Sequence, residues 1–314
     1  MGKSKNSINL KKNYPIKVSC LGSVYIKSSI EEISLSLNSL FSSKYYPDEI
    51  VVVIDGEVKK EVLNYLKLFK SKTKTSFKLI YNSQNLGTGL AMRKGLEKCL
   101  NDIIVRFDSD DIALPDRLKY TFEFMQNNPN IDIVSSPLIE FIHSINNDEV
   151  NAYYRSIPLG EKISKIVNFR NPINHPSVAF RKNSILAIGS YEDVKYFEDY
   201  FLWIKAVKNN LKFKNLTEPT VLMKRQTLST RRSGILFCLY DIKFVLKVFQ
   251  QGYLKPIFYI SSSIRIILKV FSFLYSILAR LIFWRSKKFK LKNPYIYPVE
   301  FFNRKYIKKV IQSI

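Results

Sequence analysis

Short apolar runs rich in β-branched residues recur through the first 136 residues, and they constrain the fold more than any other feature of the sequence. Five runs of six residues each stand out, at 16–21, 50–55, 77–82, 103–108 and 131–136. Each is apolar almost throughout, which is typical of parallel strands that are covered on both faces. The sequence therefore predicts a mostly parallel sheet.

Between these runs, apolar residues recur at helical spacing. One such stripe spans 30–41 and another spans 118–125. Pro115 suits the first position of the second helix, and Asn128-Pro129 should end it. The alternation over about 135 residues indicates a Rossmann-like α/β half. After Ser136 the pattern loosens into loops with isolated apolar runs, until a further helix is expected from Asp199.

The glycine-rich loops that bind phosphates in many α/β proteins are absent from the sequence. The first run is followed by Gly22-Ser23-Val24-Tyr25 instead of GxGxxG, and GxxxxGK[ST] does not occur. A nucleotide bound here would need its diphosphate neutralised in another way. A divalent metal held by carboxylates is the natural candidate.

Acidic residues lie where such a metal would be needed, at the carboxyl ends of two predicted strands. Asp55 ends one run, and Asp108, Asp110 and Asp111 lie at or just after the end of another. In an extended segment, Asp108 and Asp110 point the same way and offer hard oxygen ligands to Mg²⁺ or Mn²⁺. The alternative is a solvated turn, with Asp116 aiding the helix that follows.

A third acidic feature, Glu198-Asp199, lies between bulky aromatic residues. Two adjacent carboxylates are costly to bury there unless they have a use. A carboxylate near a helix N-terminus stays ionised, which suits a general base. The alternative is ordinary capping of the helix by acids. The presence of all three acidic features on one α/β scaffold favours a catalytic site.

Several strings of the chain, in this order, resemble the inverting family 2 glycosyltransferases with a GT-A fold. The resemblance covers about residues 18–234. It is strongest to the subgroup that builds bacterial O-antigen and capsular or exopolysaccharide repeat units on a polyprenyl diphosphate carrier. The strings are PDEIVVVIDG at 47–56, NLG at 85–87, RFDSDDI at 106–112, PDR at 115–117, NHPS at 174–177, GSY at 189–191, EDYFLW at 198–203 and RR at 231–232.

The resemblance implies roles for the acidic residues. Asp55 would recognise the uracil ring of a UDP-sugar. Asp108-Ser109-Asp110 would be the DXD motif that holds Mn²⁺ or Mg²⁺, with Asp110 the main ligand and Asp108 or Asp111 assisting at the ribose or the metal. Asp199 would be the general base, with Glu198 beside it in the catalytic pair.

The resemblance also implies that Arg231 and Arg232 pair with phosphates of the donor or acceptor, and Arg93 is a weaker candidate of the same kind. The QxxRW element of processive synthases is absent, as is any bundle of transmembrane helices. We therefore expect transfer of a single sugar. Many relatives have Asp-Asp where this chain has Ile54-Asp55, so fewer groups would contact the uracil.

His175 has two interpretations. The imidazole could touch a donor phosphate or the metal, or it could fix a loop by bonding a backbone carbonyl, which we favour. His143, in an irregular stretch, is given no role.

Charge divides the chain in two. It carries 50 Lys and Arg against 26 acids, a formal +24, and the part from residue 241 onward holds 15 of these cations and 2 of the acids. We expect a GT-A domain at 14–240, with a nucleotide-sugar half at 14–136 and an acceptor half at 137–240. A helical, basic, membrane-associating extension should follow at 241–314.

Within that extension, residues 257–284 are densely apolar but too often interrupted by charge for a plain membrane span. Polar residues recur at intervals of three or four and should form one narrow stripe on a helix; they are Ser261, Arg265, Lys269, Ser272, Ser276 and Arg280. This pattern favours a helix lying in an anionic bilayer interface, followed by the basic run 285–292. The alternative is a helix packed on the catalytic domain with its stripe facing water.

Three scattered cysteines and a polar, basic N-terminus without an apolar signal core suit a reducing compartment. We expect a peripheral protein at the cytoplasmic face of the inner membrane. It would move one hexose, glucose or galactose, from a UDP donor to a lipid-linked sugar such as GlcNAc-diphospho-undecaprenol, through a β linkage. No nucleic-acid partner is expected. The alternatives are a basic nucleic-acid-binding protein and a non-catalytic membrane scaffold.

Overall fold

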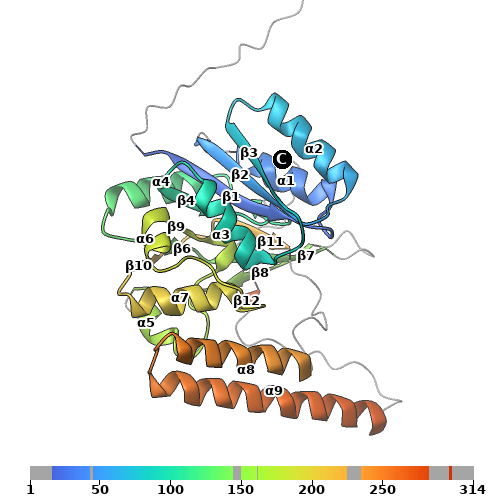
Figure 1. Ribbon diagram of the computed structural model, residues 1–314, viewed down its shortest axis with the longest axis vertical. Coiled ribbons are helices and arrows are strands. Elements are labelled where there is room, and N and C mark those ends of the chain that lie inside the picture. The colour runs from blue at the N-terminus through green and yellow to red at the C-terminus, as the bar shows by residue number, and fades with distance from the viewer. Residues whose placement is uncertain are drawn as a thin grey trace, which may run out of the picture.

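The computed structural model describes residues 16–42, 45–143, 150–160, 162–224, 235–282 and 297–298. A seven-stranded sheet forms the centre, in the order β10-β6-β9-β4-β1-β2-β3 (Figure 1). Its strands are β1 (Val18–Val24), β2 (Glu49–Asp55), β3 (Ser76–Asn82), β4 (Ile103–Arg106), β6 (Ile133–Ser135), β9 (Ala179–Arg181) and β10 (Phe213–Asn215).

The parallel part of the prediction is confirmed for four of the five runs, because β1 pairs in parallel with β2 and β4, and β2 pairs in parallel with β3. The fifth run forms β6, which is not a direct neighbour of β4 in the sheet. The antiparallel strand β9, which comes later in the sequence, lies between β4 and β6. A three-residue strand such as β9 is too short to show a periodicity, which is why the sequence did not reveal it.

A second, five-stranded sheet has the order β12-β8-β7-β11-β5. Its strands are β5 (Ile112–Ala113), β7 (Leu138–His143), β8 (Val150–Arg155), β11 (Val221–Lys224) and β12 (Tyr297–Pro298). The expectation of loops between Ser136 and Asp199 is therefore wrong. That stretch contains the β7–β8 hairpin, β9 and short helices. β5 continues directly from the aspartates after β4, so this sheet borders them.

The helices are α1 (Ile30–Ser39), α2 (Lys60–Lys72), α3 (Thr88–Lys98), α4 (Arg117–Asn127), α5 (Lys162–Ile166), the 3-10 turn η1 (His175–Ser177), α6 (Lys182–Ala187), α7 (Glu198–Lys208), α8 (Ile235–Gln250) and α9 (Pro256–Ile282). α4 ends where Asn128 predicted, but it begins at Arg117 and not at Pro115. Pro115 lies in a turn instead, closed by the Arg117 N–H donating to the Leu114 carbonyl over 2.9 Å.

Apolar residues fill both sides of the seven-stranded sheet. One cluster joins α1, α2 and α4 to the sheet, around Leu37, Val52 and Phe122. The other joins α3, α7, α8 and the start of α9 to the opposite face, around Leu96, Trp203 and Phe244. Alternate residues of β2 enter the two clusters, as the two-sided burial of a parallel strand requires.

α8 and α9 form an antiparallel pair, the α8–α9 hairpin, which lies beyond α7 on the edge of the molecule (Figure 1). Among the helices in the described part of the chain, none combines the length and the apolar character needed to cross a bilayer. Residue 241 falls inside α8, and the division of the chain at that point stays a prediction. The basic run 285–292 lies outside the described residues.

Candidate functional site

Three aspartates gather just beyond the carboxyl end of β4. Asp108, Asp110 and Asp111, here called the acidic cluster, each place a carboxylate oxygen within 4.8 Å of the others. The predicted extended geometry is wrong, because β4 ends at Arg106 and a turn follows, with the Asp111 N–H 3.4 Å from the Asp108 carbonyl. This turn brings Asp111 beside the other two carboxylates, which an extended strand would not do.

Serines of α1 and of the loop before it support the turn. The Ser36 hydroxyl donates to the Asp108 carbonyl at 2.6 Å, and the Ser39 hydroxyl accepts from the Ala113 N–H at 2.8 Å. The hydroxyls of Ser28 and Ser109 lie 3.4 Å apart. Small polar residues on the buried side of α1 therefore satisfy the backbone groups that a tight turn leaves without partners.

Burial and mutual repulsion make the acidic cluster electrostatically costly. The pKa of Asp110 rises to about 6, first because of burial and then because of the charges of Asp108 and Glu32. Burial, followed by the charges of Asp108 and Asp110, raises the pKa of Asp111 well above its usual range. Three carboxylates in this state fit a divalent cation, which would relieve the repulsion and which prefers oxygen ligands.

Arg106 provides the cationic partner in the cluster, a role that the sequence analysis did not assign. Its buried guanidinium forms a two-pronged ion pair with the Asp108 carboxylate. Positions 106 and 108 are two residues apart in the sequence. Side chains at that spacing in a strand lie on the same face, so the sequence already allowed this contact. Buried Arg117 donates to the backbone carbonyls of Arg106 and Pro176 and so ties β4 to η1.

Asp55 organises the loop that follows β3. Its Oδ1 accepts from Asn82 Nδ2 at 2.8 Å and from the Leu86 N–H at 2.9 Å, and its Oδ2 accepts from the Gly87 N–H at 2.9 Å. Gly87 has φ 84°, a left-handed conformation that glycine adopts without a Cβ clash, and it directly precedes α3. The Asp55 carboxylate therefore holds the two residues that directly precede α3.

Glu198 and Asp199 open α7. Asp199 Oδ2 accepts from Asn171 Nδ2 at 2.7 Å, and its Oδ1 accepts from the Tyr200 N–H at 2.7 Å. The contact with Tyr200 means that Asp199 does satisfy a free N–H at the helix start, as the capping alternative supposed. The start of α3 packs closely on the start of α7, since a Cβ added to Gly89 would come within 3.0 Å of the Glu198 Cβ.

His175 and Tyr191 form a buried pair. His175 Nε2 lies 2.9 Å from the Tyr191 hydroxyl, so the imidazole fixes a loop through a side chain and not through the predicted backbone carbonyl. Burial, and then the charge of Arg106, lowers the pKa of His175 well below its usual range, so the ring is neutral. The charges of Arg106, Asp199, Glu198 and Asp108 all act on Tyr191, which places it within electrostatic reach of both acidic groups.

The arginines predicted to bind phosphates are not brought together by the described structure. Arg93 is half-exposed on α3, with its Nε 3.6 Å from the Glu97 carboxylate one turn later. Arg231 and Arg232 lie outside the described residues. Lys224, the last described residue before them, forms an ion pair of 2.6 Å with Glu32, whose charge also acts on Asp110.

Comparison with solved structures supports the fold. The chain aligns with S. aureus TarS, solved as residues 1–349 in complex with UDP-GlcNAc, with a TM-score of 0.56 and 18% sequence identity. The alignment covers 74% of this chain and 66% of that one. At this identity the likeness concerns the fold alone.

Comparison with sequences identifies the family. The family model described as Glycosyl transferase family 2 matches residues 24–188, more than half of the chain. A UDP-Gal:alpha-D-GlcNAc-diphosphoundecaprenol beta-1,3-galactosyltransferase of Escherichia coli is 31% identical over 81% of this chain and 90% of its own length. The amylovoran biosynthesis glycosyltransferase AmsE of Erwinia amylovora is 32% identical over 82% of this chain and 97% of its own length. The chain therefore belongs to glycosyltransferase family 2.

Proposed function

We propose that this glycosyltransferase moves one hexose, galactose or glucose, from a UDP donor to a sugar carried on a polyprenyl diphosphate, with inversion at the anomeric carbon. The observation that carries the proposal is the placement of the acidic cluster at the end of β4. This is the edge of an α/β sheet where ligands bind. The name of the Escherichia coli relative supports a GlcNAc-diphospho-undecaprenol acceptor, and the name of AmsE supports a role in the biosynthesis of a polysaccharide.

In the proposed reaction, Asp199 accepts the proton of the acceptor hydroxyl while that oxygen attacks the anomeric carbon. The bond between the anomeric carbon and the UDP oxygen breaks on the opposite side, which inverts the configuration and gives a β linkage from an α-linked donor. Asn171 holds one Asp199 oxygen and so orients the carboxylate. Catalysis of this kind depends mainly on positioning and charge stabilisation.

The donor would lie along the carboxyl ends of β2 and β4. Asp55 and its loop would contact the uracil, while Asp108, Asp110 and Asp111 would hold Mn²⁺ or Mg²⁺. When bound, that ion supplies positive charge against the departing diphosphate. Arg93, Arg231 and Arg232 are further candidates for phosphate contacts. Since the acceptor is a membrane lipid, the protein would work as a peripheral protein at the cytoplasmic face.

Transfer by the purified protein tests the proposal. UDP-galactose, UDP-glucose and other UDP-hexoses are offered with Mn²⁺ and a synthetic GlcNAc-diphospho-lipid, and the product is analysed for linkage. We expect product from one donor, and its loss with EDTA, with Asp110→Ala and with Asp199→Ala.

Two exposed acids provide matched controls. Asp116→Ala removes a carboxylate that makes no capping bond at the start of α4, and Asp193→Ala removes one five residues before Glu198. Both variants should keep full activity. Failure of the protein to bind UDP would contradict the proposal.

A further inference from the structure

The α8–α9 hairpin turns apolar side chains away from the protein body. On α8 the exposed large side chains recur at intervals that place them on one face, and they are Ile235, Leu236, Leu239, Ile242, Leu246 and Phe249. Of the 22 exposed large hydrophobic side chains in the described part of the molecule, 14 lie between residues 235 and 271. A helix pair in water normally exposes polar residues instead.

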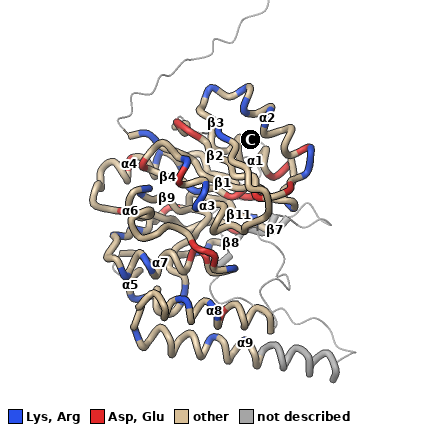
Figure 2. Tube along the Cα trace, in the orientation of Figure 1, with Lys and Arg blue, Asp and Glu red and all other residues tan. Residues whose placement is uncertain are grey.

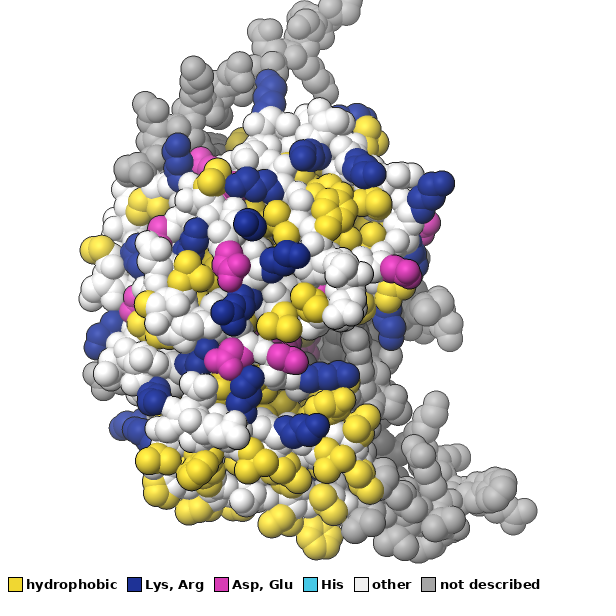
Figure 3. Space-filling view, in the orientation of Figure 1, with side chains coloured by type: hydrophobic (Ala, Val, Ile, Leu, Met, Phe, Trp, Pro, Cys, Tyr) yellow, Lys and Arg dark blue, Asp and Glu magenta, His cyan; other side chains and the backbone are white. Residues whose placement is uncertain are grey.

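α9 repeats this arrangement beside α8. Its exposed apolar residues also share one face, and they are Ile257, Ile260, Ile264, Ile267, Leu268 and Phe271. Together the two rows form what we call the outward apolar face. In the space-filling view, hydrophobic side chains gather along the edge of the molecule that α8 and α9 form (Figure 3). Charged positions are sparse along both helices (Figure 2).

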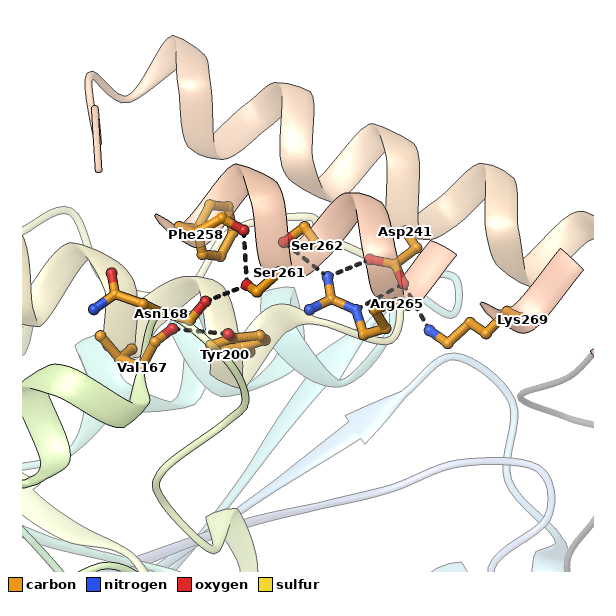
Figure 4. Close-up of polar contacts among 9 residues, drawn as sticks. All are labelled: Val167, Asn168, Tyr200, Asp241, Phe258, Ser261, Ser262, Arg265 and Lys269. Atoms are coloured by element: carbon orange, nitrogen blue, oxygen red, sulfur yellow. Dashed lines mark hydrogen bonds and ion pairs between the residues drawn. The ribbon is translucent and has the colours of Figure 1, made fainter. Parts of the chain in front are cut away.

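Three charged side chains of the hairpin, Asp241, Arg265 and Lys269, pair with one another between the two helices. Asp241 on α8 is 0% exposed and accepts from Arg265 at 2.7 and 3.1 Å and from Lys269 at 2.6 Å, both on α9 (Figure 4). The Arg265 and Lys269 side chains are only 22% and 30% exposed. The start of α9 packs on the body, as the alternative supposed. The predicted stripe does not face water at Ser261, Arg265 and Lys269, however, because these residues face α8 and the body. The side chains of Ser272, Ser276 and Arg280 lie outside the described ones.

The hairpin is fixed to the helix that carries Glu198 and Asp199. The ring of Phe197, the residue before Glu198, stacks on Phe244 of α8 at 4.6 Å between centroids and 7° between planes. The Tyr253 hydroxyl donates to Asn168 Oδ1 at 2.7 Å, and Lys247 forms an ion pair of 3.1 Å with Glu192. These contacts join the hairpin to Phe197 at the start of α7 and to two neighbouring segments of the body, so the hairpin and the start of α7 are held in one packed unit.

We propose that the outward apolar face docks on an anionic lipid membrane and holds the start of α7 at a set height above the bilayer. The inference rests on the proposed function, in which the acceptor is a membrane lipid. A helix pair lying in the interface buries its apolar side among the acyl chains and leaves its other side to the protein. The carboxylates of α7 would then stay within reach of a diphosphate that cannot leave the membrane surface.

Charge favours a membrane over a second copy of the chain. Residues 235–271 contain five cations against the single acid Asp241, which is already paired inside the hairpin. Lys243 and Lys255 are exposed on the hairpin. The sequence after residue 271 adds ten Lys or Arg and one acid. Two copies joined through this face would bring like charges together, whereas anionic headgroups attract them.

Co-sedimentation of the full chain with lipid vesicles tests the inference. Vesicles of phosphatidylethanolamine with phosphatidylglycerol are compared with neutral phosphatidylcholine vesicles. We expect binding to the anionic vesicles, weakened at least about tenfold by the double variant Leu239→Glu/Leu268→Glu, because two exposed apolar side chains that the bilayer would bury become charged. The matched control Leu68→Glu/Leu100→Glu, at equally exposed leucines of the body, should bind as the unchanged protein does.

Two further measurements separate this inference from the proposed function. Transfer to a water-soluble, short-chain sugar diphosphate should be equal for all these proteins, because the substitutions lie away from the acidic cluster. Light scattering should show a monomer in every case. Unchanged vesicle binding by Leu239→Glu/Leu268→Glu, or a dimer that this variant breaks, would overturn the docking surface while leaving the transferase assignment intact. Absence of transfer with vesicle binding retained would instead count against the proposed function.

Discussion

Two charge clusters of this molecule are built in opposite ways. The acidic cluster holds three carboxylates with Arg106 as their buried cation, and the pKa values of Asp110 and Asp111 are raised. The second cluster, here called the hairpin cluster, holds one carboxylate, Asp241, and two cations, Arg265 and Lys269. Burial there works against the charge of Asp241, but the bonds from Arg265 and Lys269 outweigh it and lower the pKa of Asp241.

The difference separates a site from a structural contact. The carboxylate of the hairpin cluster needs no ligand, because Asp241 already accepts hydrogen bonds from Arg265 and Lys269. The acidic cluster has more negative charge than its protein partners balance, so it gains stability when a cation binds. An excess of buried like charge of this kind is characteristic of functional sites.

The largest expected effect is on catalysis. Asp110→Ala should lower the transfer rate about 1000-fold, because a main contact to the metal-bound diphosphate is lost. The same change should leave the metal-free protein as stable as before or more stable, since a repelling carboxylate is removed. Transfer assays and urea unfolding in EDTA measure the two effects. A marked loss of stability in EDTA would show that Asp110 has a structural role.

Arg106→Met tests the balance within the acidic cluster. Removing the buried partner of Asp108 should lower the free energy of unfolding in EDTA by about 3 kcal/mol. Added Mn²⁺ should restore part of this loss, because the ion takes over the charge compensation. Urea unfolding with and without Mn²⁺ measures the difference, and an equal loss under both conditions would show that the guanidinium acts by packing alone.

Asp241→Asn tests the hairpin cluster. It leaves Arg265 and Lys269 without a counter-charge, but both side chains reach some water, so we expect a loss of about 2 kcal/mol. Mn²⁺ should have no effect on this loss. If Mn²⁺ restored part of the lost free energy of unfolding, the two clusters would be coupled through α7.

The pH dependence should have opposite signs at the two clusters. The folded-state pKa of Asp110 is raised from 3.8 to about 6, so between these values the folded state binds the extra proton and gains stability as the pH falls. The folded-state pKa of Asp241 is lowered, so its contribution is present above its unfolded pKa and is lost as the pH falls through its folded pKa.

Thermal melting in EDTA from pH 7 to pH 4 should therefore show a stabilising component on the order of 1 kcal/mol that Asp110→Ala removes. Asp241→Asn should leave that component in place. A melting profile of Asp110→Ala that matches the unchanged protein would rule out this assignment.

Much of the site was accessible to sequence reasoning because it depends on local features. Asp55 and Asp108 were expected near strand ends, and a strand end is set by the apolar run before it. Arg106 was missed as a partner although it lies in the same run, since a lone charge in a strand does not reveal which carboxylate it meets. His175 and Tyr191 are 16 residues apart, and only the packing of η1 against the segment before α7 joins them.

The sequence by itself determined the parallel strands β1 to β4, the acidic residues at or just beyond the ends of two of them, and the polar stripe of α9, because each follows from the spacing of residues along one segment. Only the tertiary structure decided where β9 inserts, how the turn after β4 gathers three carboxylates, and that the stripe of α9 faces inward. The physical reason is that periodicity shows which side chains share a face, whereas the neighbours of that face come from segments far away in the chain. For α9 that neighbour is Asp241, a single buried carboxylate that draws two cations inward and leaves the apolar side of the hairpin exposed.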